Sequence, residues 1–246
     1  MSDVITAGMV VIGDEILSGR TKDKNIGHLA DMLTAVGIDL KEVRIVGDEQ
    51  RAIVEAVNSL RAAYTYVFTT GGIGPTHDDI TADAIAAAFG VPCTYHPEAY
   101  ALLEAHYAAR GVEFTEARKR MARTPEGASL IANPVSVAPG FNIGNVYVMA
   151  GVPSVFQAML DKVIPTLRTG QKLISEGIHC TFPEGTIGGP LGDIQKAHPE
   201  TIIGSYPKFD TTGAWTEIVV RSRSREKLDA AVRAVKEMLD SLGQRS

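Results

Sequence analysis

A glycine-rich loop with two adjacent carboxylates, residues 69–81, is the segment best suited to chemistry. Its glycines have no Cβ, so the backbone can turn tightly and present N–H groups to an anion. Asp78 and Asp79 follow, and carboxylates beside an anion site are explained by a divalent metal, since Mg²⁺ takes one or two carboxylates together with substrate oxygens. The loop therefore predicts a site for a phosphorylated ligand. The contacts expected from it are Thr70, Gly71, Gly72, Gly74, Pro75, Thr76 and Thr81.

Two further polar loops follow apolar runs in the same way. Gly13, Asp14 and Glu15 come after the first run and Asp48 after the second, and we expect the first three to contact the ligand. The loops at the carboxyl ends of parallel strands form the binding edge of such a sheet, so all three loops are expected to meet there. The metal ligands expected from them are Asp48, Asp78 and Asp79.

Helix capping is the competing interpretation of these acidic residues. Asp79 or Thr81 would cap the helix that follows the long loop, and the acidic pairs after the first two strands have the same ambiguity. The long loop is neither a P-loop, since no lysine follows in the required order, nor a dinucleotide-binding fingerprint. His77 is more typical of a hydrogen-bond partner than of an acid or base, and no nucleophile elbow is present.

Strand and helix patterns alternate over the first 170 residues. Residues 4–12 form a continuous apolar run typical of a strand buried on both faces, and three more strands are expected at 38–46, 66–70 and 145–149. The helices are expected around 26–33, 53–60, 81–89, 97–110, 115–123 and 153–167. This alternation predicts an α/β fold with a mostly parallel sheet and right-handed crossovers.

Proline and glycine recur in a fourth segment, at 133–141 and again at 149–153. Rigid turns are expected there, and Pro153 would start a helix whose N-terminus points toward the same sheet edge as the three polar loops. We expect Gly140, Gly151 and Pro153 to contact the ligand.

The pattern changes near residue 170, which predicts two domains, residues 1–170 and 171–246. In the second, the expected order is strand, helix, two strands and a long helix with one apolar stripe. The strands are expected at 177–182, 202–207 and 216–223, and the first helix at 189–196. This small α+β domain has balanced charge and no glycine–carboxylate loop, so we expect it to contribute little to the chemistry.

Composition and charge exclude several classes of protein. With 45% hydrophobic residues, the 246-residue chain is globular and needs no disulfides, and its two cysteines, with no metal-binding spacing, fit a reducing cytoplasm. The N-terminus lacks a basic segment and a long apolar run, so neither a signal peptide nor a membrane anchor is expected. A net charge of −5 and no basic patch beyond 118–123 argue against nucleic acid. We expect a cytoplasmic homo-oligomer.

Four stretches strongly resemble the competence/damage-inducible protein A family: IGDEILSGRTKDKN (12–25), TTGGIGPTHDDIT (69–81), APGF (138–141) and AGVPSVFQAML (150–160). The first domain of that family belongs to the molybdopterin-binding (MoaB/Mog-like) superfamily, which implies a three-layer α/β/α sandwich. By this resemblance, Asp48 and Asp79 match acidic positions tied to pterin adenylylation or metal binding, and we take both as catalytic. Relatives in the family are associated with divalent-metal-dependent hydrolysis of ADP-ribose-type pyrophosphates.

The sequence departs from the family pattern in three places. Ser154 stands where glutamate is common, and Val135-Ser136-Val137 replaces the usual small residues before APGF. These changes bear on metal affinity or substrate choice. The chain ends at Ser246 without the amidase domain of longer members, so a short form is expected and no deamidation is assigned.

Three functions remain open for a small phosphorylated ligand, either nucleotide or pterin. Hydrolysis of a nucleotide pyrophosphate such as ADP-ribose, with Mg, Mn or Co as the metal, uses every loop and is preferred. Molybdopterin adenylyl transfer needs the same acidic pair and a pterin pocket as well. Non-enzymatic binding of a pterin or nucleotide is the third, because one fold serves many functions.

Overall fold

The computed structural model describes residues 4–211 and 213–243, and the chain divides into two compact units, Met1–Gly170 and Gln171–Ser246. Each unit has its own buried core. The larger unit holds all the glycine–carboxylate loops, so its sheet decides where they lie.

A six-stranded sheet forms the centre of the larger unit, in the order β2-β1-β3-β8-β7-β6. Its strands are β1 (Ile5–Ile12), β2 (Ile38–Val46), β3 (Tyr66–Thr70), β6 (Ser129–Ile131), β7 (Gly140–Ile143) and β8 (Val146–Met149). β2, β1, β3 and β8 pair in parallel, at the positions that the sequence predicts. β7 runs antiparallel to both of its neighbours, β8 and β6. The prediction of a mostly parallel sheet is confirmed, and the antiparallel edge was not predicted.

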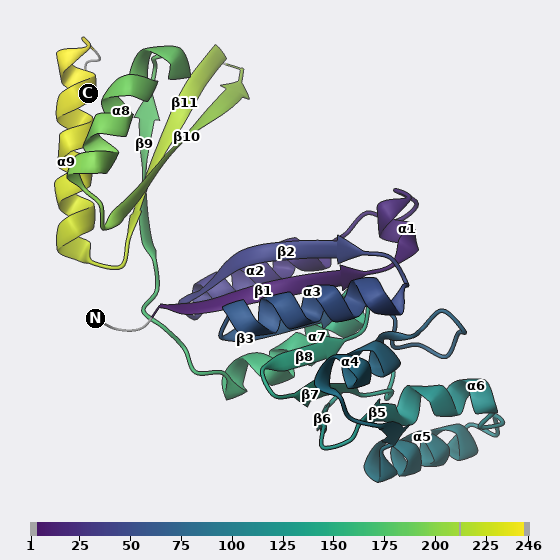
Figure 1. The fold of residues 1–246 in the computed structure, drawn as a ribbon. Helices are drawn as coiled ribbons and strands as arrows, with labels where there is room; N and C mark the ends of the chain where they lie inside the picture. Colours follow the sequence, from purple (N-terminus) through teal and green to yellow (C-terminus); the bar gives the residue numbers. More distant parts are fainter. Residues whose placement is uncertain (1–3, 212, 244–246) are drawn as a thin grey trace. The chain divides into compact units, whose positions relative to one another are not determined.

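Helices cover both faces of this sheet (Figure 1). α2 (Asn25–Ala35) and α7 (Pro153–Val163) pack into one core, and α3 (Gln50–Ala63) and α4 (Thr81–Phe89) into the other. Successive side chains of a strand point to opposite faces, so β1 places Met9 in the first core and Val10 in the second. The expected three-layer α/β/α arrangement is confirmed.

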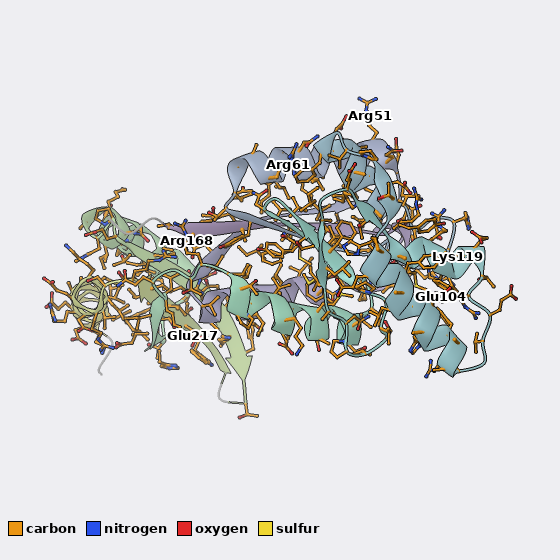
Figure 2. The ribbon with its side chains drawn as sticks, turned by 90° about the horizontal axis from the view of Figure 1, so that it is seen from below. Arg51, Arg61, Glu104, Lys119, Arg168 and Glu217 are labelled. Atoms are coloured by element: carbon orange, nitrogen blue, oxygen red, sulfur yellow. The ribbon has the colours of Figure 1, made fainter. Side chains whose placement is uncertain are left out.

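Arg61 joins the two helices of the second face. Its guanidinium group donates to the Ala88 carbonyl oxygen over 2.9 Å and lies 4.1 Å from the centre of the Phe89 ring. Figure 2 shows Arg61 on α3, with Arg51 projecting from the same helix into solvent. The contact holds α4 in place, and the glycine-rich loop ends at the first residue of α4.

A helical excursion separates α4 from β6. It contains the ribbon of β4 (Cys93–Tyr95) and β5 (Arg123–Pro125), with α5 (Pro97–Ala109) and α6 (Glu116–Lys119) between them. The helix predicted over 115–123 was too long: α6 stops at Lys119, a short 3₁₀ turn follows at 120–122, and β5 begins. The reason is the pairing of β5 with β4, which holds Arg123 in extended backbone opposite Tyr95.

The smaller unit has the predicted strand–helix–strand–strand–helix order: β9 (Ile174–Cys180), α8 (Glu184–Ala197), β10 (Thr201–Asp210), β11 (Gly213–Ser222) and α9 (Arg225–Ser241). Its strands form an antiparallel sheet in the order β10-β11-β9. α8 begins five residues before the predicted helix, because burial of Ile187 outweighs the poor helix propensity of its glycines. In the described ranges, 4–211 and 213–243, no helix is long and apolar enough to cross a membrane.

Candidate functional site

A cleft of about 500 Å³ opens beside the ends of β1, β3 and β8. The loops that follow these strands line it, together with the segment between β6 and β7. In open parallel sheets, this is the edge at which ligands bind. The predicted site residues that line the cleft are Glu15, Gly71, Gly72, Gly74, Pro75, Asp79, Gly151 and Pro153.

Gly71 and Gly72 form the tight turn at the end of β3. Their φ angles, +107° and +65°, are in the region that L side chains rarely adopt. A Cβ on Gly71 would lie 2.1 Å from the carbonyl oxygen of Ile12, and one on Gly72 would lie 2.2 Å from Thr81 Oγ1. Glycine is therefore required at both positions, because a Cβ would collide with the backbone of β1 at Gly71 and with the Thr81 side chain at Gly72.

Consecutive amide groups of this loop line the cleft. Within the part of the chain that the structure describes, the N–H groups of Gly72, Ile73 and Gly74 have no protein acceptor. The Gly71 N–H differs, because it donates to the Met149 carbonyl oxygen over 3.2 Å. Successive unpaired amides at such a turn make a concavity that binds anions.

Asp79 lines the cleft from the other end of the loop. Its Oδ2 accepts hydrogen bonds from the Thr76 amide, at 2.8 Å, and from the Thr76 hydroxyl. Its carbonyl oxygen accepts from Arg120 Nη2 at 3.1 Å. These bonds hold residues 76–79 in one turn and, among the described residues, leave Asp79 Oδ1 without a protein hydrogen-bond donor.

Helix capping by Asp79 or Thr81 is an expectation that the structure corrects. α4 begins at Thr81, and its N-cap position has no side-chain hydrogen bond. The Thr81 side chain is buried, and its hydroxyl donates to the Gly71 carbonyl oxygen over 3.0 Å. Thr81 thus holds the glycine turn, while Asp79 is engaged by Thr76.

Asp14 and Asp48 join the ends of β1 and β2. Asp48 Oδ2 accepts from the Asp14 amide at 3.0 Å, and Asp14 Oδ1 accepts from the Asp48 amide at 3.4 Å. A Cβ on Gly47 would lie 2.3 Å from Asp14 Oδ1, so this glycine makes room for the carboxylate. α1 (Asp14–Leu17) and α3 also begin without side-chain caps, which excludes the capping interpretation of both acidic pairs.

Negative charge gathers around Asp48. Burial raises the pKa of this carboxyl most, and the charges of Asp14, Glu15 and Asp78 raise it further, against the lowering effect of the hydrogen bond from the Asp14 amide. The pKa of the exposed Asp78 is instead lowered, first by the nearby Thr76 side chain and then by its own backbone amide. A cation bound nearby would favour the ionised form of the Asp48 carboxyl group and offset the repulsion from the other carboxylates.

The three predicted metal ligands are not gathered into one cluster. Asp79 lines the cleft, whereas Asp48 and Asp78 lie outside its lining. Across residues 4–211 and 213–243, no group of three or more His, Cys, Asp or Glu side chains could hold a metal ion. A metal at this edge would have to take part of its coordination from the ligand, as Mg²⁺ does in phosphate sites.

Several other predicted contacts also lie outside the cleft lining. Gly140 begins β7, where a Cβ would lie 2.4 Å from the Val148 carbonyl oxygen, so the pairing with β8 requires glycine. The Gly13 N–H donates to the Val46 carbonyl oxygen over 3.0 Å. Thr70 lines a recess of about 50 Å³ that shares Glu15 and other residues with the cleft. The full set outside the lining is Gly13, Asp14, Asp48, Thr70, Thr76, Asp78, Thr81 and Gly140.

Asn25, which the sequence did not single out, ties β3 to the loop after β8. Its Nδ2 donates to Thr70 Oγ1 and to the Gly151 carbonyl oxygen, both at 2.9 Å, and the side chain is buried. The Thr70 hydroxyl in turn donates to the Ala150 carbonyl oxygen over 2.9 Å. Asn25 thereby fixes two loops that line the cleft. Its place at the end of the 12–25 motif was the one signal that the sequence offered.

Asn133 organises the wall between β6 and β7, another role that the sequence did not predict. Its Oδ1 accepts from the amides of Val135, at 3.0 Å, and Ser136, at 3.1 Å. Its Nδ2 donates to Ser136 Oγ over 2.6 Å and to the Ala138 carbonyl oxygen over 2.8 Å. Met121, Asn133, Ser136 and Ala138 line the cleft from this side. Ser154, where the sequence departs from the family, is exposed and outside the lining.

Two family models match the chain, one in each compact unit. "Probable molybdopterin binding domain" matches residues 8–169, and "FAD synthase, middle domain" matches residues 172–243. Together they account for nearly all the described residues.

Relatives and a solved structure agree with these matches. A protein of Archaeoglobus fulgidus is 31% identical, with 94% of this chain and 97% of the relative covered. A "Probable FAD synthase" of Caenorhabditis briggsae is 30% identical over 95% of this chain, which spans only 49% of that relative. The crystal structure of CinA from Thermoplasma acidophilum, a protein of unknown function, has a TM-score of 0.61 at 30% identity, covering 65% of this chain and 96% of that one.

Proposed function

The chain belongs to the molybdopterin-binding domain family, as a CinA-like member, and we propose that it is a metal-dependent hydrolase of nucleotide pyrophosphates such as ADP-ribose. One observation carries the proposal: the unpaired amides of Gly72, Ile73 and Gly74 and the carboxylates of Glu15 and Asp79 line the same cleft. Amides of this kind favour an anion, and carboxylates repel one. Amides and carboxylates can serve the same phosphate site when a divalent cation lies between the carboxylate and the phosphate.

The donor set fits a metal that shares its coordination with the ligand. Asp79 Oδ1 has no protein donor among the described residues, and Glu15 is exposed at the same cleft. The pKa of Asp48 is raised first by burial and further by the charges of Asp14, Glu15 and Asp78, so Glu15 belongs to a group of carboxylates. A divalent metal bound here would neutralise phosphate charge and polarise a phosphoryl oxygen.

The protein groups then have separate tasks in hydrolysis. The amides of the glycine turn hold the phosphoryl group that does not react, and the Asp79 carboxylate orients a water molecule toward the other phosphorus. The oxygen of that water bonds to phosphorus as its proton passes to the Asp79 carboxylate. The bridging P–O bond breaks, and the bridging oxygen leaves on the second phosphate. With ADP-ribose, the products are AMP and ribose 5-phosphate.

FAD is a second nucleotide pyrophosphate to consider. A relative that matches 95% of the chain is named a probable FAD synthase, and the smaller unit matches the middle domain of FAD synthase. The pyrophosphate of FAD presents the same phosphoryl oxygens as that of ADP-ribose. We therefore include FAD among the substrates of the proposed hydrolysis.

Molybdopterin adenylyl transfer is the alternative that the family match favours. It would use the same amides and carboxylates, with the pterin in the cleft. A phosphate oxygen of the pterin would bond to the α-phosphorus of ATP, and pyrophosphate would leave. Binding of a pterin or nucleotide without turnover is the remaining alternative.

Product analysis separates these functions. The purified protein is incubated with ADP-ribose, with FAD, and with molybdopterin plus ATP, each in the presence of Mg²⁺, Mn²⁺ or Co²⁺, and the products are resolved by chromatography. We expect AMP from ADP-ribose or FAD only when metal is present, and none from Asp79→Asn. Transfer of AMP from ATP to molybdopterin, with ADP-ribose and FAD left uncleaved, would contradict hydrolysis and support the alternative.

A further inference from the structure

The hydrogen bonds of Asn133 show that the hydroxyl hydrogen of Ser136 points away from the Asn133 side chain. Asn133 Oδ1 faces two amide N–H groups, which only donate, so the other end of the side chain must be the nitrogen. Both hydrogens of Nδ2 are then committed, one to Ser136 Oγ and one to the Ala138 carbonyl oxygen. Ser136 Oγ is therefore an acceptor in this contact, and its own hydrogen must point elsewhere.

That hydrogen has no protein partner in the ranges 4–211 and 213–243. Ser136 is exposed and lines the cleft. Its oxygen and its backbone N–H are both anchored to Asn133, which is 7% exposed. The hydroxyl is thus a positioned hydrogen-bond donor at the cleft, on the wall between β6 and β7.

The lining of the cleft makes such a neutral donor important. Among the described residues that line it, none is lysine or arginine. The side chains of Glu15 and Asp79 offer only acceptors when ionised. The negative oxygens of a phosphorylated ligand must then be met by amide and hydroxyl groups, or by a metal. The glycine turn provides amides from one loop, and Ser136 provides a hydroxyl from another.

We propose that the Ser136 hydroxyl donates a hydrogen bond to a phosphoryl oxygen of the bound ligand, which makes the 133–138 segment a second part of the pyrophosphate site. The inference rests on the proposed function for its ligand class, a nucleoside pyrophosphate. It adds a binding residue on a wall to which no ligand contact had been assigned. A donor bonded to a charged oxygen contributes more than one bonded to a neutral oxygen, so its loss is measurable.

Calorimetric titration in the presence of Mg²⁺ tests the assignment. Three probes are used against wild type, Ser136→Ala and Ser136→Thr: ADP-ribose (throughout as its α,β-methylene analogue, which cannot be cleaved at the bridge), inorganic pyrophosphate and adenosine. Removal of the hydroxyl should raise the Kd for ADP-ribose and for pyrophosphate about 10- to 100-fold, the range for a hydrogen bond to a charged group. The Kd for adenosine should not change, and Ser136→Thr, which keeps a hydroxyl, should restore affinity.

Val135→Ala is the matched control, because Val135 is 56% exposed in the same segment and donates to Asn133 only through its backbone. It should leave all three affinities unchanged. Equal affinity of Ser136→Ala and wild type for pyrophosphate would overturn the proposal. It would also be overturned if Ser136→Ala lost as much affinity for adenosine as for pyrophosphate. The hydroxyl would then contact the nucleoside, or the segment would have collapsed.

The same titrations distinguish this inference from the proposed function. If wild type binds pyrophosphate and Ser136→Ala does not, while no substrate is cleaved, hydrolysis is wrong and the Ser136 contact stands. If wild type binds neither ADP-ribose nor pyrophosphate, both are wrong.

Discussion

Replacing Gly71 by alanine tests the contact that places the glycine turn against β1. The φ of +107° costs an L residue about 1–2 kcal/mol. The new Cβ would lie 2.1 Å from the Ile12 carbonyl oxygen, which is backbone and cannot rotate away, and overpacking of this kind costs about 1–3 kcal/mol. We therefore expect Gly71→Ala to lower the free energy of unfolding of the larger unit by about 2–5 kcal/mol.

Gly90→Ala is the matched control for backbone conformation. Gly90 ends α4 with a φ of +68°, and no atom lies within 4 Å of a Cβ built there. Only the conformational cost applies, so we expect a loss of about 1–2 kcal/mol. The difference between the two variants isolates the collision with Ile12.

Urea unfolding followed by far-UV circular dichroism measures both losses. Trp215 is the only tryptophan of the chain and belongs to the smaller unit, so its fluorescence reports that unit. The fluorescence transition should not move in either variant. If Gly71→Ala destabilises the protein no more than Gly90→Ala, the turn does not lie against β1 as described, and the reasoning from close approach is refuted.

Three further predictions concern charge, strain and thiol reactivity. The pKa of Asp48 is raised in the folded protein, so its ionisation destabilises the fold. This cost begins near the pKa of the unfolded chain, about 4, and is complete above the higher pKa of the folded protein. Asp48→Asn should thus raise the melting temperature of the ligand-free protein at pH 7 but not at pH 3, and an equal rise at both would contradict the charge argument. Val137 has a φ of +71°, a strained value for a β-branched residue, so Val137→Gly should keep or raise the melting temperature, and a clear fall would count against strain. Burial raises the pKa of Cys93 to about 11 and Cys180 is buried, so a thiol reagent should react slowly with native protein at pH 8 and rapidly with both thiols in urea; rapid native labelling would be the contrary result.

Local patterns in the sequence were enough to predict most of the larger unit. β1 is a continuous apolar run because both of its faces are covered, and β2 and β3 end as predicted because polar, glycine-bearing loops follow them. The glycine turn was predictable for a similar reason, since a backbone that passes within contact distance of another strand excludes every other residue at Gly71.

Partnerships between residues far apart in sequence were not predictable in this way. Asn25 bonds to Gly151, which lies 126 positions later, and nothing near Asn25 in the sequence indicates that partner. Asp79 has the sequence context of a helix cap, yet its carboxylate is engaged by Thr76 within the loop. The short strands β6 and β7 are recognisable only through their pairing with β8, because three or four residues carry too little periodicity.

Amide NMR spectroscopy of the ¹⁵N-labelled protein, titrated with the non-cleavable α,β-methylene analogue of ADP-ribose and Mg²⁺, tests most directly that the cleft is the ligand site. We predict that the amide signals of Gly72, Ile73 and Gly74 shift most, because their unpaired N–H groups take up phosphoryl oxygens, and that the signal of Ser136 moves with them. Gly90 should not respond. Large shifts confined to residues 171–246, with the glycine turn unchanged, would contradict the account.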